Sequence, residues 1–159
     1  MQITIREPGS AITHFIGMMM ALVAATPLLI KAALSSGTLG FRAMAIFILS
    51  MVLLYGASAT YHSVNLTGKA LRFFKKLDHM MIFVLIAGTY TPVCLIILGG
   101  PLGYTLLAVV WGIALFGIIL KACWVTCPKW FSSMIYIAMG WVCLGVFGTL
   151  RDKLQHADF

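Results

Sequence analysis

Residues 79–98 read HMMIFVLIAGTYTPVCLIIL, and this run of twenty residues decides the class of protein. It contains no Asp, Glu, Lys or Arg, and its one histidine stands at the first position. A helix of about 20 residues rises about 30 Å, which is the thickness of the hydrocarbon core of a bilayer. The run therefore predicts a helix that crosses a membrane.

Four further apolar runs accompany this one along the chain. The five runs predict membrane spans at residues 12–34, 43–62, 79–98, 103–122 and 132–150. The turn Gly99-Gly100-Pro101 is expected to join the third and fourth spans as an antiparallel hairpin. We expect residues 1–150 to form one all-α, polytopic transmembrane helical bundle, and residues 151–159 to form a short polar tail.

The composition of the whole chain excludes a soluble domain. Of its 159 residues, 62% are hydrophobic and only 9% are charged, and the mean hydropathy is +1.03. A soluble chain is about 25% charged, because its surface has to be hydrated. Five spans use up the length, so no additional soluble domain is expected.

The formal net charge of +7 can indicate two kinds of partner, nucleic acid or anionic lipid. A basic surface binds nucleic acid in soluble proteins, but here most basic residues lie between apolar runs, where they meet anionic headgroups and orient the spans. We therefore expect membrane lipids as partners and no nucleic acid.

The basic residues also predict the orientation of the chain. An internal N-terminus places seven basic residues in the cytoplasm and four outside: Arg6, Lys69, Arg72, Lys75, Lys76, Lys121 and Lys129 against Lys31, Arg42, Arg151 and Lys153. Cytoplasmic loops carry the excess of basic residues. This bias predicts a multi-pass protein of the cell membrane with a cytoplasmic N-terminus.

Ionisable residues near the spans are the candidate functional residues, because each is costly in lipid unless it is paired or faces a polar cavity. Ser58 and His62 are four residues apart and share a helix face. Asp78 follows sixteen residues later, where the third span begins at the same membrane face. An imidazole, a hydroxyl and a carboxylate at one depth predict a metal site or a proton-transfer site.

Structural alternatives stay open for these residues. His62 and Asp78 can be interfacial residues at helix ends, with Asp78 as the N-cap of the third helix. Glu7, His14 and His79 are further polar candidates. Glu7 can instead be an acid favoured by the helix dipole, and His14 a buried polar residue of the bundle.

A family resemblance is carried by four short motifs in a fixed order. They are Arg6-Glu7-Pro8-Gly9 with Thr13-His14, Ser58-Ala59-Thr60-Tyr61-His62, Leu77-Asp78-His79 and Ala87-Gly88-Thr89-Tyr90-Thr91-Pro92. In this order they resemble the bacterial hemolysin III membrane proteins, the prokaryotic branch of the progestin and adiponectin receptor group. The resemblance covers about residues 5–147.

The resemblance implies a bundle of seven helices with a cytoplasmic N-terminus and a zinc site near the inner membrane face. His62 matches the zinc ligand of the second helix, with Ser58 one turn before it. Asp78 matches the residue that positions a zinc-bound water. Two more histidines on the last helix, in an H-x-x-x-H pair, complete the site of the family.

The sequence departs from this pattern after Leu150, where a polar tail follows the fifth span. His156 in that tail has no histidine four residues away and does not replace the missing pair. One histidine, one aspartate and one serine are fewer than the three protein ligands of a catalytic zinc site. We therefore expect an incomplete zinc site in a shortened family member, unless a second copy of the chain forms a homo-oligomer and completes it.

Three functions stay open on these grounds. The first is a zinc-dependent, lipid-related role, such as hydrolysis of a lipid amide or membrane homeostasis, with His62 as metal ligand and Asp78 and Ser58 as catalytic residues. The second is a lytic or pore-forming protein, although a pore needs a polar lining. The third is an inactive truncated fragment, so enzymatic activity of this chain stays an open question.

Overall fold

The computed structural model describes residues 5–65, 67–124 and 128–155. All regular structure in these residues is helical, which confirms the expected all-α class. In chain order the elements are α1 (Pro8–Ser63), α2 (Gly68–Pro92), a π-helical turn η1 (Val93–Leu98), α3 (Gly100–Cys123), α4 (Lys129–Trp141), a 3₁₀ segment η2 (Val142–Val146) and α5 (Phe147–Gln155).

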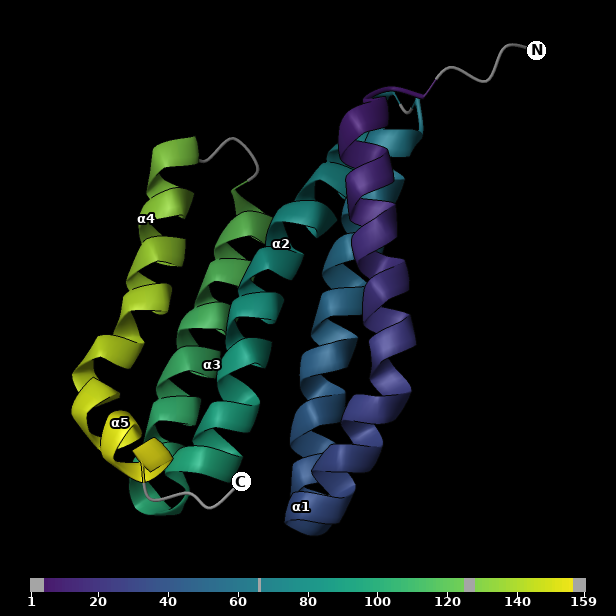
Figure 1. The fold of residues 1–159 in the computed structure, drawn as a ribbon. Helices are drawn as coiled ribbons and strands as arrows, with labels where there is room; N and C mark the ends of the chain where they lie inside the picture. The colour runs from purple at the N-terminus through teal and green to yellow at the C-terminus, as the bar shows by residue number, and fades with distance from the viewer. Residues whose placement is uncertain (1–4, 66, 125–127, 156–159) are drawn as a thin grey trace.

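The long helix α1 folds back on itself at Ser36 and Gly37. Gly37 has a φ of 60°, a left-handed conformation that glycine adopts without a steric penalty, and Ser36 is also outside the helical range. The amide N–H of Glu7 donates to the carbonyl of His62 over 3.0 Å, so the two ends of α1 lie together. Figure 1 shows the two limbs of α1 side by side.

Four helical stretches of the described residues are long and apolar enough to cross a membrane: Pro8–Ser63, Gly68–Leu98, Gly100–Cys123 and Trp130–Gln155. The predicted number is five, and it differs because the predicted spans 12–34 and 43–62 are the two limbs of the folded α1. The chain therefore runs five times between the two ends of the bundle. In Figure 1, α5 lies at the end opposite the start of α1.

The third predicted span begins earlier than its hydropathy indicates. α2 starts at Gly68, whereas the expected span starts at His79. Lys, Arg, Ala and Leu in residues 69–77 are strong helix formers, although their charges end the apolar run. The helix is therefore longer than its hydrophobic part.

The fifth predicted span, residues 132–150, is not one regular helix. α4 gives way to η2 at Val142, and α5 then continues as far as Gln155. The first part of the predicted polar tail is thus helical, while residues 156–159 lie outside the described residues.

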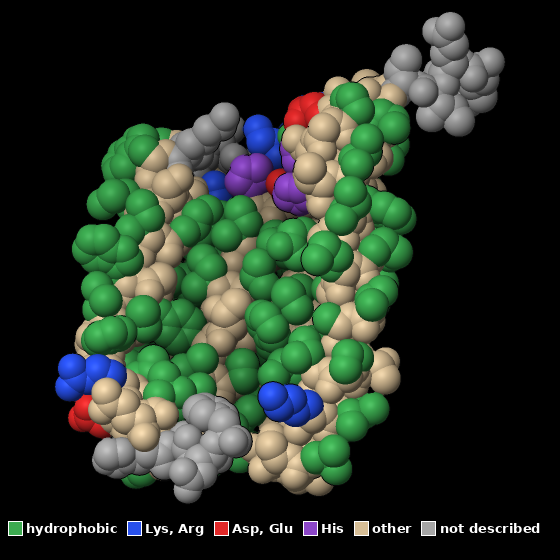
Figure 2. Space-filling model, in the orientation of Figure 1, with side chains coloured by type: hydrophobic (Ala, Val, Ile, Leu, Met, Phe, Trp, Pro, Cys, Tyr) green, Lys and Arg blue, Asp and Glu red, His purple; other side chains and the backbone are tan. Residues whose placement is uncertain are grey.

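The buried core lies between α2, α3 and α4. Phe83 of α2, Val110 and Ala114 of α3 and Met139 of α4 are fully buried and belong to one cluster. Many large apolar side chains remain exposed instead, and Figure 2 shows apolar side chains over most of the face in view, with the charged side chains near its two ends. This distribution suits a helical bundle whose sides face lipid.

The hydroxyl of Tyr90 in α2 hydrogen-bonds the backbone at the junction of α4 and η2. Its hydroxyl lies 2.8 Å from the carbonyl oxygen of Met139 and 2.9 Å from that of Gly140, and it accepts the N–H of Cys143 over 3.0 Å. A break in a helix frees backbone groups that lipid cannot satisfy. The phenol of Tyr90 therefore supplies hydrogen bonds at the point where α4 gives way to η2.

Gly88 allows α2 to approach α1 closely at Ser50. A Cβ atom at Gly88 would lie 2.6 Å from the Cβ of Ser50, which is 1% exposed.

Gly88→Ala is therefore expected to lower the free energy of unfolding by about 1–3 kcal/mol through overpacking, measured by unfolding in detergent. Gly112→Ala is the control, because a Cβ there meets open space. Equal losses in both variants would contradict this close approach.

Candidate functional site

The two ends of α1 meet in a polar cluster, here called the α1 end cluster, which consists of Arg6, Glu7, His14, Tyr61 and His62. Glu7 directly precedes the first turn of α1, and His62 lies in its last turn. The Nδ1 atom of His62 lies 2.8 Å from Oε2 of Glu7. An ionised carboxylate only accepts hydrogen bonds, so Nδ1 carries the proton and the lone pair of the neutral ring is on Nε2.

Arg6 places a cationic side chain beside Glu7 as well. Its Nη2 atom lies 3.5 Å from Oε1 of Glu7 and donates to the Tyr61 hydroxyl over 3.3 Å. The guanidinium carbon lies 4.8 Å from the centre of the Tyr61 ring. Arg6 and Tyr61 are not among the predicted site residues, although each is the sequence neighbour of one, Glu7 and His62 respectively.

His14 joins the cluster from the first limb of α1. The centre of its ring lies 5.9 Å from that of His62 and 5.9 Å from that of Tyr55. Its Nδ1 atom is buried and has no hydrogen-bond partner among the described residues. An unpaired buried polar atom costs about 1–3 kcal/mol, so the packing around His14 has to offset that cost. The structure thus brings three predicted candidates together: Glu7, His14 and His62.

Asp78 and His79 form a separate pair within α2. Because α2 begins at Gly68, with Thr67 as its cap residue, the interpretation of Asp78 as an N-cap is wrong. Nδ1 of His79 donates to the Lys75 carbonyl over 2.6 Å and lies 3.8 Å from Oδ2 of Asp78. Asp78 therefore lies about three turns inside the helix, next to a histidine that is already bonded to the backbone.

Ser58 is buried on the second limb of α1, with 2% of its surface exposed. In the part of the chain that the structure describes, no hydrogen bond or ion pair joins Ser58 or Asp78 to His62. Direct contacts therefore do not join the three residues into one site. The catalytic roles of Ser58 and Asp78 stay predictions.

The described residues do not form a metal site by themselves. In residues 5–65, 67–124 and 128–155, no group of three His, Cys, Asp or Glu side chains is placed to hold a metal ion. His62 can offer Nε2, but the oxygens of Glu7 already contact Arg6 and His62. A catalytic zinc takes three protein ligands, so the zinc that the resemblance implies does not fit these residues alone. His156 lies outside the described residues.

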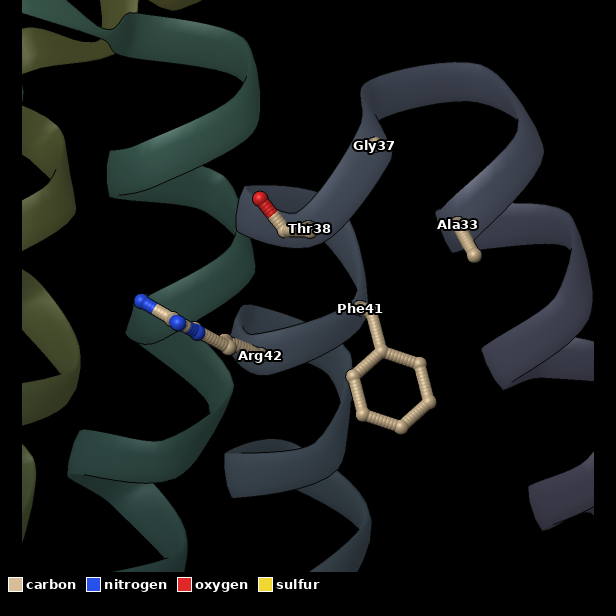
Figure 3. Close-up of a pocket in the computed structure, with 5 residues that line it drawn as sticks. All are labelled: Ala33, Gly37, Thr38, Phe41 and Arg42. Atoms are coloured by element: carbon tan, nitrogen blue, oxygen red, sulfur yellow. The ribbon is translucent and has the colours of Figure 1, made fainter.

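A separate hollow of about 400 Å³ lies at the other end of the bundle, beside the turn at Ser36 and Gly37 in the middle of α1. Its lining is Ala33, Gly37, Thr38, Phe41 and Arg42. In Figure 3, Ala33 and Phe41 come from the two limbs on either side of the turn, and Arg42 points away from Phe41. No acid, histidine or thiol is among these five residues, so the lining offers no general base or metal ligand.

Comparison with known proteins gives matches along nearly the whole chain. The family model described as "Haemolysin-III related" matches residues 2–158. Hemolysin-3 of Bacillus cereus is 40% identical over 153 residues, which are 96% of this chain and 69% of that protein. The Hemolysin-3 homolog of Bacillus subtilis (strain 168) is 40% identical over 157 residues, which are 98% of this chain and 73% of that protein. No solved structure gives a significant match.

The contact between Glu7 and His62 is expected to stabilise the fold only weakly, because the Glu7 side chain is 45% exposed. A double-mutant cycle with Glu7→Gln and His62→Gln should give a coupling free energy of about 0.2–1 kcal/mol. It is measured from unfolding in detergent. Lys31→Gln, close to the turn of α1 at the other end of the bundle, should show no coupling to Glu7→Gln. A coupling no larger than that of this control would argue against the contact.

Proposed function

The chain belongs to the hemolysin III family, and from this premise we propose that it is a multi-pass protein of the cell membrane with a hydrolytic, lipid-related activity at the α1 end cluster. The observation that carries the proposal is the 2.8 Å contact between His62 Nδ1 and Glu7 Oε2. The carboxylate orients the ring and leaves Nε2 to act as a proton acceptor or a metal ligand.

The substrate class follows from the depth of the cluster. Each limb of α1 has about 28 residues and is about 42 Å long, whereas the hydrocarbon core is about 30 Å thick. The limb ends therefore extend into the headgroup layer. The ester and amide bonds of membrane lipids lie at this depth, and we infer that such a bond is the one hydrolysed.

The chemistry proposed for His62 is general acid and base catalysis. Nε2 takes a proton from water while the water oxygen bonds to the lipid carbonyl carbon, and Glu7 stabilises the resulting imidazolium. His62 then returns the proton to the leaving amine or alcohol as the bond from the carbonyl carbon to that group breaks. Arg6 supports this step by holding the Glu7 carboxylate.

Zinc is a further part of the proposal, within the limit set by the described residues. The Nε2 atom of His62 can bind a metal, but the described ligands are fewer than three. The remaining ligands would come from a second copy of the chain, which makes a homo-oligomer the implied assembly. No step of the proposed hydrolysis runs through the metal.

A lytic or pore-forming role is less well supported. The polar or charged side chains that are buried among the described residues are Ser50, Ser58, Thr91, Lys121 and Ser132. Four of these five are hydroxyls, and a water-filled pore needs a continuous polar lining. The buried side chains therefore favour a packed bundle over an aqueous channel.

The orientation of the chain is proposed from its charges, with the α1 end cluster on the cytoplasmic side. A single cysteine at Gly9, in a chain whose own cysteines are replaced, should react with an impermeant maleimide only after the cells are opened. A single cysteine at Thr38, beside the turn of α1, should react in intact cells. The reverse pattern would overturn the orientation, and both residues are exposed enough to react.

The purified chain in liposomes is expected to release fatty acid from a lipid amide or ester. His62→Ala should lower the rate about 10²–10⁴-fold because the general base is lost, and Glu7→Gln about 10–100-fold because the ring loses its orienting partner. Products are measured by mass spectrometry, with zinc per chain determined in the same samples. Lys31→Gln is the control and should keep the full rate. Absence of product from the unmodified chain over a panel of lipid amides and esters would overturn the proposal.

A further inference from the structure

We propose that the first turns of α2 form a binding site for an anionic phospholipid, separate from the α1 end cluster. Residues 69–76 read KALRFFKK. Lys69, Arg72 and Lys76 follow one another at intervals of three and four, so they share one helix face with Phe73. These four side chains together line one hollow of about 250 Å³.

The positive charge of this hollow is not offset by acids within the described part of the chain. Of the two acids at this end, Glu7 contacts Arg6 and His62, and Asp78 lies 3.8 Å from His79; among the described residues neither forms an ion pair with Lys69, Arg72 or Lys76. Lys69 and Arg72 make no hydrogen bond or ion pair with any described residue. Their charges are therefore left to bind an anion from outside the chain.

A hydrogen bond to α3 holds the Lys76 side chain, which lines the hollow, in place. Its Nζ atom donates to the carbonyl of Ala122 over 2.6 Å, in the last turn of α3. Carbonyls at the end of a helix lack partners within that helix, so this bond satisfies one of them and holds α2 against α3. Because the Lys76 side chain is ordered before a ligand binds, the entropy cost of binding is lower.

The depth of the hollow identifies the anion as a lipid phosphate. The apolar helix Gly68–Leu98 has 31 residues and is about 46 Å long, so it exceeds a hydrocarbon core of about 30 Å. Its basic residues place the excess at the N-terminal end, in the headgroup layer. Figure 2 shows basic side chains gathered at this end of the molecule.

Phe73 favours a lipid over a free phosphate ion as the occupant of the hollow. Its side chain is 59% exposed and lies in the lining beside the three cations. A phosphate between Lys69 and Arg72 would place the glycerol and the first acyl carbons of a lipid against this ring. Free phosphate has no apolar part to use that surface. This site shares no residue with the proposed hydrolytic site, so neither proposal depends on the other.

The test is native mass spectrometry of the full chain in detergent, titrated with phosphatidylglycerol or phosphatidylcholine. One phosphatidylglycerol should bind at least tenfold more tightly than phosphatidylcholine. Arg72→Gln should remove most of this preference, and Lys69→Gln with Arg72→Gln all of it. The matched control is Lys75→Gln, which removes the same charge from the same helix at a residue outside the hollow, and it should change affinity less than twofold.

Three outcomes would overturn the site. Equal losses in Arg72→Gln and Lys75→Gln would mean a diffuse surface potential rather than a site. Equal binding of the two lipids by the unmodified chain would mean that the phosphate charge is not recognised. Displacement of the lipid by millimolar inorganic phosphate would mean that a free anion is the occupant. Arg72 and Lys75 are both exposed, and circular dichroism of each variant checks that the helices are retained.

Discussion

Lipid offers no hydrogen bonds to the peptide group, and the rest of the structure depends on that constraint. Helices satisfy it along most of the chain, and the departures from α-helix occur where another partner or a bundle end is at hand. The turn at Gly37 lies at one end of the bundle. The change from α4 to η2 occurs where the Tyr90 hydroxyl bonds the backbone of Gly140 and Cys143. Irregular backbone is thus tolerated at the ends of the bundle or beside a buried phenol.

The same constraint concentrates polar chemistry at the ends of the bundle. Folding of α1 at Gly37 brings Glu7 to His62 across 55 positions of sequence, with one backbone and one side-chain hydrogen bond between them. The basic first turns of α2 follow directly after this point in the chain. One end therefore holds both an oriented imidazole and a cationic face that has no acid partner among the described residues. We propose that both features bind the polar parts of lipids, which lie at the ends of membrane-spanning helices.

Much of the fold could be predicted from the sequence, and less of the candidate site. The runs of apolar residues identified the helical passes, and four motifs identified the family that the matches confirm. The start of α2 was missed because the apolar run begins at His79, whereas the helix-forming residues before it extend the helix back to Gly68. Ser58 was grouped with His62 by their spacing of four residues, and Asp78 was added because of its similar depth and the family resemblance. Depth does not fix how each helix is rotated about its axis, and the His62 ring contacts Glu7, His14 and Tyr61 instead.

The sequence by itself determined that this is an all-α membrane protein and which family it belongs to, because these follow from local composition, run length and short motifs. The tertiary structure decided which polar residues meet. The two limbs of α1 had to lie against each other before Glu7 could orient His62, and α2 had to lie against α3 before Lys76 could reach Ala122. Such contacts depend on the rotation of each helix about its axis, which is set by close approaches such as that of Gly88 to Ser50.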